Sequence, residues 1–176
     1  DPSPGTRGNE RYRDDIEGGM NMINDEVHFV QAVVKDEGWL NLGKGDIVVD
    51  SAADESCWPA GQGDAFPTKE SSRKMVLKTA NGGEMNHYGQ KEVSFRYEGG
   101  KEVMGLVFQV IDFKKPLLAV RRLVEKGNRV VLSANDGESY IQNLATRVKI
   151  PIKKRGGSFV IEANFVKKAA DFTRRA

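Results

Sequence analysis

The chain has 176 residues, 39% of them hydrophobic, which suits one globular domain with a modest extension. Its 27 Lys and Arg residues nearly balance 25 Asp and Glu residues, and the net charge of +2 argues against nucleic acid as a partner. No apolar stretch approaches the roughly 20 residues that a membrane-spanning helix needs, so we expect no membrane span.

Soft metal ligands are scarce in this sequence. The single Cys57 excludes an internal disulfide, and His28 and His87 are the only histidines beside it. We therefore expect no metal and no cofactor. One cysteine and no visible leader favour a soluble protein of a reducing, cytoplasmic compartment. Because the chain opens at Asp1 without an initiating Met, its start reads as processed or truncated.

The first part of the chain is predicted to lie outside the main domain. Residues 1–15 are polar, contain two prolines and two glycines, and indicate a flexible tail. Residues 16–38 are predicted to form a partly helical extension, although the segment 27–34 is equally compatible with a strand. The helical prediction depends on apolar residues at spacings of three and four: Ile16, Met20, Ile23, Val27, Val30 and Val34.

Beyond this extension the pattern is mainly β. Glycine-rich turn signals, such as those at 81–83, 98–100, 135–137 and 156–157, separate short apolar runs, which favours a barrel or a sandwich. A turn near residues 43–45 is expected to enter a strand that ends at Asp50. One helix is expected after Pro116, from Ala119 to Lys126, and residues 166–176 are read as a basic tail. The other expected strands cover residues 75–80, 92–97, 103–111, 129–132, 140–143, 148–152 and 158–163.

The residues around Asp50 carry the clearest chemical signal. A β-branched run, Ile47-Val48-Val49, delivers this aspartate into a turn of small residues, Ser51-Ala52-Ala53. Aspartic proteases present a catalytic carboxylate in this way. The alternative is a purely structural role, in which the aspartate caps its own turn, as Asp frequently does.

Further landmarks follow Asp50 along the chain. They are Ala80-Asn81-Gly82, Tyr88-Gly89, Phe108-Gln109-Val110, Pro116-Leu117-Leu118-Ala119-Val120 with Leu123 and Gly127, the runs 127–132 and 140–143, and Gly157-Ser158-Phe159-Val160. In this order, and together with Asp50, they resemble the landmarks of retropepsin-like aspartic protease domains. The later ones resemble in particular the protease region of copia-type retrotransposon polyproteins, in which an N-L-L-S-V-x-x-L run precedes G-x-x-V-x-F. The likeness covers about residues 40 to 165, so a retropepsin-like domain is expected at 39–165.

The resemblance implies a closed barrel and a catalytic site made of Asp50, Ser51 and Ala52. Asp50 would be the catalytic carboxylate, and the Ser51 hydroxyl would brace the active-site loops across a homodimer. The segment 75–95 would form a hairpin flap over an extended peptide substrate. The residues expected to contact that peptide are Ala80, Asn81, Gly82, Gly83 and Leu118.

Two alanines depart from the retropepsin pattern. Ala52 and Ala119 stand where many retropepsins have glycine, although copia relatives often carry Ser at the second position. A positive φ at Ala52 would cost roughly 1–2 kcal/mol, and a methyl group beside the substrate would slow catalysis. The sequence thus leaves two functions open: an active dimeric endopeptidase, or an inactive domesticated retropepsin fold that serves as a structural or protein-binding subunit of a larger assembly.

Other polar residues have plainer interpretations. Asp54 and Glu55 read as solvated loop charges, and His87 and Tyr88 as residues that pack on a strand face. Cys57 could act as a nucleophile only beside a His base, and no spacing brings either histidine near it. The paired basic residues read as solvated faces rather than as a phosphate-binding surface.

Overall fold

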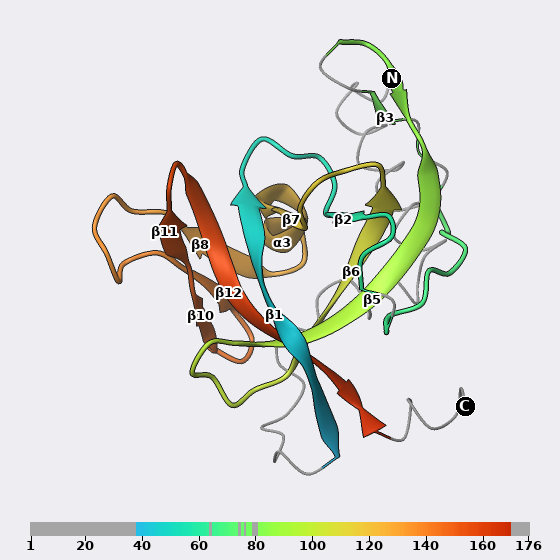
Figure 1. Ribbon diagram of the computed structural model, residues 1–176. Helices are drawn as coiled ribbons and strands as arrows, with labels where there is room; N and C mark the ends of the chain where they lie inside the picture. Colours follow the sequence, from blue (N-terminus) through green and yellow to red (C-terminus); the bar gives the residue numbers. More distant parts are fainter. Residues whose placement is uncertain (1–37, 64, 74, 76, 79–80, 170–176) are drawn as a thin grey trace, which may run out of the picture.

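The computed structural model describes residues 38–63, 65–73, 75, 77–78 and 81–169 (Figure 1). Over these residues the chain is mainly β with one short helix, as the sequence predicted. No helix in these ranges is long and apolar enough to cross a membrane. The tail at 1–15, the extension up to residue 37, Ala80 and the end of the basic tail at 170–176 lie outside the described residues.

A seven-stranded sheet forms the body of the molecule. Its strands pair in the order β1-β7-β2-β6-β5-β12-β11, and β1 also pairs with β12, so the sheet curls back on itself (Figure 1). Most neighbours are antiparallel, whereas β1 runs parallel to β7 and β2 runs parallel to β6. The strands are β1 (Trp39–Asp50), β2 (Cys57–Pro59), β5 (His87–Tyr97), β6 (Met104–Ile111), β7 (Leu117–Ala119), β11 (Lys153–Arg155) and β12 (Ser158–Lys168).

Two smaller sheets and the helix complete the described fold. Strands β8 (Asn128–Val131), β9 (Tyr140–Asn143) and β10 (Lys149–Pro151) form an antiparallel meander. Strands β3 (Leu77–Lys78) and β4 (Glu84–Met85) form a short hairpin. Helix α3 (Val120–Glu125) directly follows β7, buries Leu123, and ends before Gly127, whose φ of 87° suits glycine. This helix lies within the predicted range.

The burial of each strand agrees with its place in the sheet. Strand β6 is buried along nearly its whole length, as a continuous apolar run predicts for an interior strand, and it lies between β2 and β5. Strand β5 alternates instead, with Val93 and Phe95 pointing inward. Ile47 of β1 and Ile161 of β12 are paired and fully buried, so the place where β1 pairs with β12 belongs to the same core.

Several predicted boundaries differ from the structure. The expected turn at 43–45 is a register shift between Asn41 and Gly43 inside β1, which already begins at Trp39. Strand β12 continues to Lys168, beyond the predicted end of the domain at residue 165, so the tail expected from 166 begins as a paired strand. The side chain of Lys167 is buried there, which its charge does not suggest from sequence alone.

Candidate active site

Asp50 lies at the end of β1, where the chain leaves the sheet. Its side chain is half-buried, and its Oδ1 accepts a hydrogen bond from the backbone N–H of Ala52 at 2.8 Å. Ser51 and Ala52 are exposed in the turn that follows. The aspartate therefore fixes its own turn through one oxygen, the role expected of a capping aspartate, while its second oxygen forms no hydrogen bond within the described residues.

The turn after Asp50 is held against β7 and β6. In the parallel register Asp50 lies opposite Ala119, and Leu118 is buried directly before it. The buried hydroxyl of Ser56 accepts a hydrogen bond from the N–H of Ala119 at 3.0 Å, and the carbonyl of Ser56 accepts one from the N–H of Gln109 at 2.9 Å. The predicted catalytic segment and the landmark residues 117–119 thus lie side by side.

The two alanines fit the backbone without strain. Within the described residues the non-glycine residue with a positive φ is Arg147, so Ala52 does not adopt the left-handed conformation considered above. Ala119 has φ −78° and ψ 117°, an ordinary extended conformation, and its methyl group is fully buried. The cost of a left-handed alanine therefore does not arise at either position.

Glu55 is not the solvated loop charge that the sequence suggested. Its Oε1 accepts hydrogen bonds from Nη1 of Arg73, at 2.6 Å, and from Nη2 of Arg122. The side chains of Glu55, Arg73 and Arg122 are only 15%, 9% and 14% exposed. By contrast the side chain of Asp54 is 86% exposed and faces Arg121 at 3.4 Å. One ion cluster therefore ties the aspartate loop to α3 and to the segment that leads into β3.

The hairpin predicted to be a flap is present in part. Lys78 pairs with Glu84 and Leu77 with Met85, and Asn81, Gly82 and Gly83 are exposed at its turn. Ala80, the remaining predicted residue of the tip, lies outside the described residues. Met85 packs against the buried cluster of Cys57, Ile111 and Leu117, and so does Ala53 of the aspartate loop. The base of the hairpin and the aspartate loop thus share one apolar contact surface.

The remaining titratable side chains near this site have structural partners. His87 Nε2 lies 2.8 Å from Oε1 of Gln109, which also accepts a hydrogen bond from the Ser71 hydroxyl, and the Tyr88 hydroxyl donates to Asp112 at 2.8 Å. Burial, together with the nearby charge of Glu55, raises the pKa of the Cys57 thiol to about 12. At neutral pH this thiol stays protonated and is a poor nucleophile.

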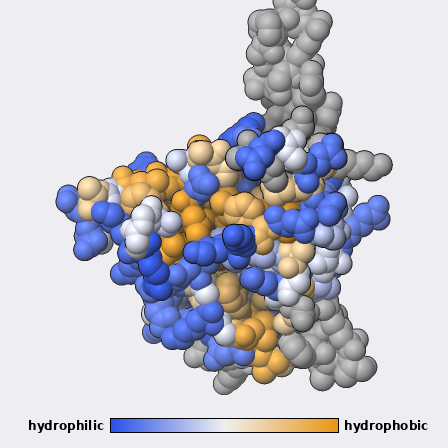
Figure 2. Space-filling view, turned by 45° about the horizontal axis from the view of Figure 1, so that its top comes forward, coloured by the Kyte–Doolittle hydropathy of each residue, from blue (hydrophilic) through white to orange (hydrophobic). Residues whose placement is uncertain are grey.

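Hydrophobic side chains reach the surface on the face of the molecule that Figure 2 shows. Figure 2 brings the top of Figure 1, where β1 ends, toward the viewer and shows a band of hydrophobic surface bordered by hydrophilic residues. No group of three or more His, Cys, Asp and Glu side chains suited to a metal ion occurs within the ranges the structure describes. The candidate reactive group of this loop is the Asp50 carboxylate, three residues before Ala53, which packs on the apolar cluster of Cys57, Ile111 and Leu117.

Sequence reasoning missed the ion cluster of Glu55, Arg73 and Arg122. Its members come from three segments distant in sequence, and each reads as an ordinary surface charge in its own segment. The one local signal was the position of Arg122, directly before the buried Leu123 on a helix of six residues.

Comparison with known protein families, with curated proteins and with solved structures gave no match to this chain.

Proposed function

We propose that this chain is a retropepsin-like aspartic endopeptidase of the copia retrotransposon type, active as a homodimer on extended peptides. The observation that carries the proposal is the place of Asp50: it ends β1, enters a turn of small residues, and lies in parallel register beside the apolar strand β7. The pairing of β1 with both β7 and β12 supports the closed barrel that the resemblance implies.

The proposed chemistry needs a second carboxylate. Two carboxylates held face to face share one proton, because like charges that close cannot both ionise. The ionised member then removes a proton from water while the protonated member donates a hydrogen bond to the peptide carbonyl. A single chain with one such aspartate obtains the second from an identical copy across a two-fold axis. The exposed positions of Ser51 and Ala52 leave this edge of the molecule open to a partner.

The position of the hairpin β3–β4 supports the proposal that the substrate is an extended peptide. Its base packs through Met85 on the same apolar cluster that Ala53 contacts, so its turn projects from the side of the aspartate loop. An extended peptide between the two would place alternate side chains against apolar surface. We therefore expect apolar side chains on both sides of the bond that is cut.

The test is cleavage of a random peptide pool at mildly acidic pH by the wild-type chain and two variants. Asp50→Asn is expected to reduce cleavage by at least about a hundredfold, because an amide cannot share the proton. Asp54→Asn is the matched control, since Asp54 lies four residues further on and is 86% exposed. Pepstatin should inhibit the wild type. Cleavage that survives Asp50→Asn, or that ignores pepstatin, would refute the proposal.

The second candidate function is an inactive retropepsin fold that binds a protein partner. The observation that favours it is the exposed Ala52, whose methyl group stands where retropepsins keep a bare glycine backbone beside the substrate. Wild-type protein without any pepstatin-sensitive cleavage, together with a monomeric mass by light scattering, would favour this function.

A further inference from the structure

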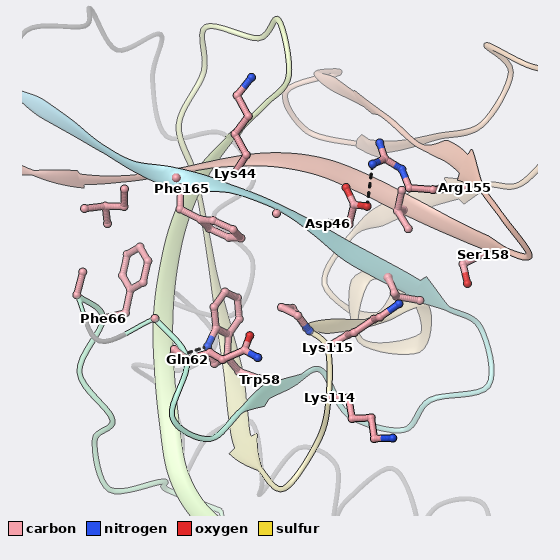
Figure 3. A pocket seen from close by; sticks show the side chains of 18 residues that line it. Lys44, Asp46, Trp58, Gln62, Phe66, Lys114, Lys115, Arg155, Ser158 and Phe165 are labelled. Carbon is pink, nitrogen blue, oxygen red and sulfur yellow. Dashed lines mark hydrogen bonds and ion pairs between the residues drawn. The ribbon is translucent and has the colours of Figure 1, made fainter.

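A cavity lies apart from the candidate active site. It has a volume of about 580 Å³ and opens between β1, the loop after β2, the β6–β7 loop and the start of β12 (Figure 3). Its lining includes Val48 of β1 and Pro116 before β7, but not Asp50, Ser51 or Ala52. We refer to this cavity as the basic groove. Its volume falls in the range of about 300–1,000 Å³ that small-molecule sites occupy.

The floor of the basic groove is aromatic. Trp58, Phe66 and Phe165 line it, and the rings of Trp58 and Phe165 meet edge to face with centroids 5.5 Å apart. The indole Nε1 of Trp58 donates a hydrogen bond to the carbonyl of Gln62 at 2.9 Å. Trp58 is 3% exposed and Phe66 is 5% exposed, so each adds only a small part of its ring to the floor. Because the one polar atom of Trp58 is satisfied, the part that reaches the cavity is apolar, and an apolar ring is the best complement.

One wall of the basic groove is held in place by two buried lysines. The ammonium of Lys91 donates to the carbonyls of Gln62 at 2.6 Å and Gly63 at 3.1 Å, and that of Lys167 donates to the carbonyl of Ala65. Lys91 is 4% exposed and Lys167 is 8% exposed. The wall is therefore preorganised, which lowers the conformational entropy that the protein loses when a ligand binds.

The rim of the basic groove carries surplus positive charge. Arg155 forms ion pairs with Asp46, at 3.1 Å, and with Glu162. Lys44 lies 3.2 Å from a Glu98 carboxylate oxygen.

Two further lysines of the rim are available to contact a ligand. Lys114 and Lys115 are exposed and form no hydrogen bond or ion pair with any other residue in the described ranges. In Figure 3 they stand on the side of Trp58 opposite to Phe66. Two exposed lysines that are neighbours in sequence, on the rim of a cavity with aromatic residues in its floor, complement a ligand that is apolar at one end and anionic at the other.

We propose that the basic groove binds a small organic anion with an aromatic body, whose carboxylate, sulfonate or phosphate group contacts Lys114 and Lys115. The ring system lies on Trp58, Phe66 and Phe165. This site is lined by a single chain and is independent of the proposed proteolytic activity.

A matched pair of dyes tests the charge requirement. Anilinonaphthalene sulfonate and N-phenylnaphthylamine share one ring system, and only the first carries an anionic group. We expect the sulfonate to bind one per chain, to quench Trp58 fluorescence, and to bind about fivefold to tenfold more tightly than the neutral dye at low salt. The advantage should shrink as salt rises to about 0.5 M, because the lysines are exposed. Equal affinity for both dyes would overturn the proposal.

Variants locate the site. Lys114→Gln with Lys115→Gln should remove the preference for the sulfonate, and Ala65→Phe should block both dyes because Ala65 lines the cavity. The control pair Lys101→Gln with Lys149→Gln removes the same charge outside the lining and should leave binding unchanged. Equal losses in the two lysine pairs would show that net charge alone drives binding, and the assignment would fall.

Displacement identifies the class of ligand. Naphthoate and naphthyl phosphate should each displace the sulfonate dye, and the Lys114/Lys115 pair variant should weaken both competitors. Displacement by an acidic aromatic peptide alone, with no effect of the small anions, would contradict the assignment to a small molecule.

Discussion

At the scale of single residues, the carboxylates after β1 divide into two classes that the sequence does not separate. Asp54 is almost fully exposed, whereas Glu55 is 15% exposed and is shared by two guanidinium groups. Both were read as solvated charges because they are adjacent in a polar loop. The difference arises from tertiary contacts: Arg73 and Arg122 approach Glu55 from segments distant in sequence, and no pattern within the loop 51–56 indicates that approach.

This contrast gives a paired stability prediction. Glu55→Gln leaves two part-buried guanidinium groups near one another without the carboxylate whose single oxygen both approach. We expect a loss of about 2–4 kcal/mol in the free energy of unfolding, because the change removes the carboxylate that two part-buried guanidinium groups share, while Arg122 keeps its ion pair with Glu125 at 3.7 Å. Asp54→Asn should cost at most about 0.5 kcal/mol, since its ion pair is exposed.

Urea unfolding followed by tryptophan fluorescence measures both Glu55→Gln and Asp54→Asn. Equal losses in the two variants would show that the cluster around Glu55 contributes no more than an exposed ion pair. A large loss in Glu55→Gln alone would confirm that this cluster stabilises the loop that carries the candidate catalytic aspartate.

At the scale of elements, long or strongly patterned segments were predictable and short ones were not. The run Tyr140–Asn143 and the end of β1 at Asp50 match the structure, since apolar residues and turn signals bound them. Strand β2 has three residues and contains Pro59, and every residue of β11 is charged and exposed. Both pair only because a neighbouring strand offers an edge, so tertiary context decides their conformation.

The candidate site was predictable to the same degree. A strand that delivers an aspartate into a small-residue turn is visible in sequence, and so is the apolar run before α3. The parallel pairing of Asp50 with Ala119 is not visible, because residues 51–118 separate the two and no local signal sets the register. The basic groove was missed for the same reason: its floor joins residues of β2, the following loop and β12.

Gly89 in β5 supports a prediction about the base of the β3–β4 hairpin. It has φ 141° at a register shift between His87 and the rest of β5, and an added Cβ would lie 2.1 Å from the carbonyl oxygen of Lys69. The neighbouring bridge between Lys69 and Gln90 holds the incoming segment by two backbone hydrogen bonds of 2.8 and 2.9 Å. Gly89→Ala should break this bridge and lower stability by about 2–5 kcal/mol.

The matched control for Gly89→Ala is Gly82→Ala in the hairpin turn. Gly82 also has a positive φ, 82°, but an added Cβ would meet no atom within 4 Å. Its cost should therefore be only the backbone strain of about 1–2 kcal/mol. Thermal or urea unfolding compares the two variants, and slow amide exchange at Gln90 reports the bridge. A bridge that persists in Gly89→Ala would contradict the packing described here.

At the scale of the whole molecule, the two proposed sites differ in how many chains they need. The basic groove is built from one chain, and β1 and β12 define it together because their long pairing brings Lys44 close to Phe165 and Val48 opposite Val160. The proposed dyad would take Asp50 from each of two chains, and the turn at Ser51 and Ala52, which is exposed in the single chain, would lie at the contact between them. Dimerisation should therefore be required for peptide cleavage and should leave ligand binding at the basic groove unchanged.

This difference predicts two distinct dependences on protein concentration. Below the dissociation constant of the homodimer, the rate of peptide cleavage per chain should rise in proportion to protein concentration, because each active site needs two chains. Dye binding per chain at the basic groove should stay constant over the same range. Light scattering on the same samples should show the mass move from 19.5 kDa toward twice that value as the specific cleavage rate rises. A specific cleavage rate that is independent of concentration in samples that remain monomeric would rule out the shared dyad, since one chain would then be cutting peptide with a single Asp50.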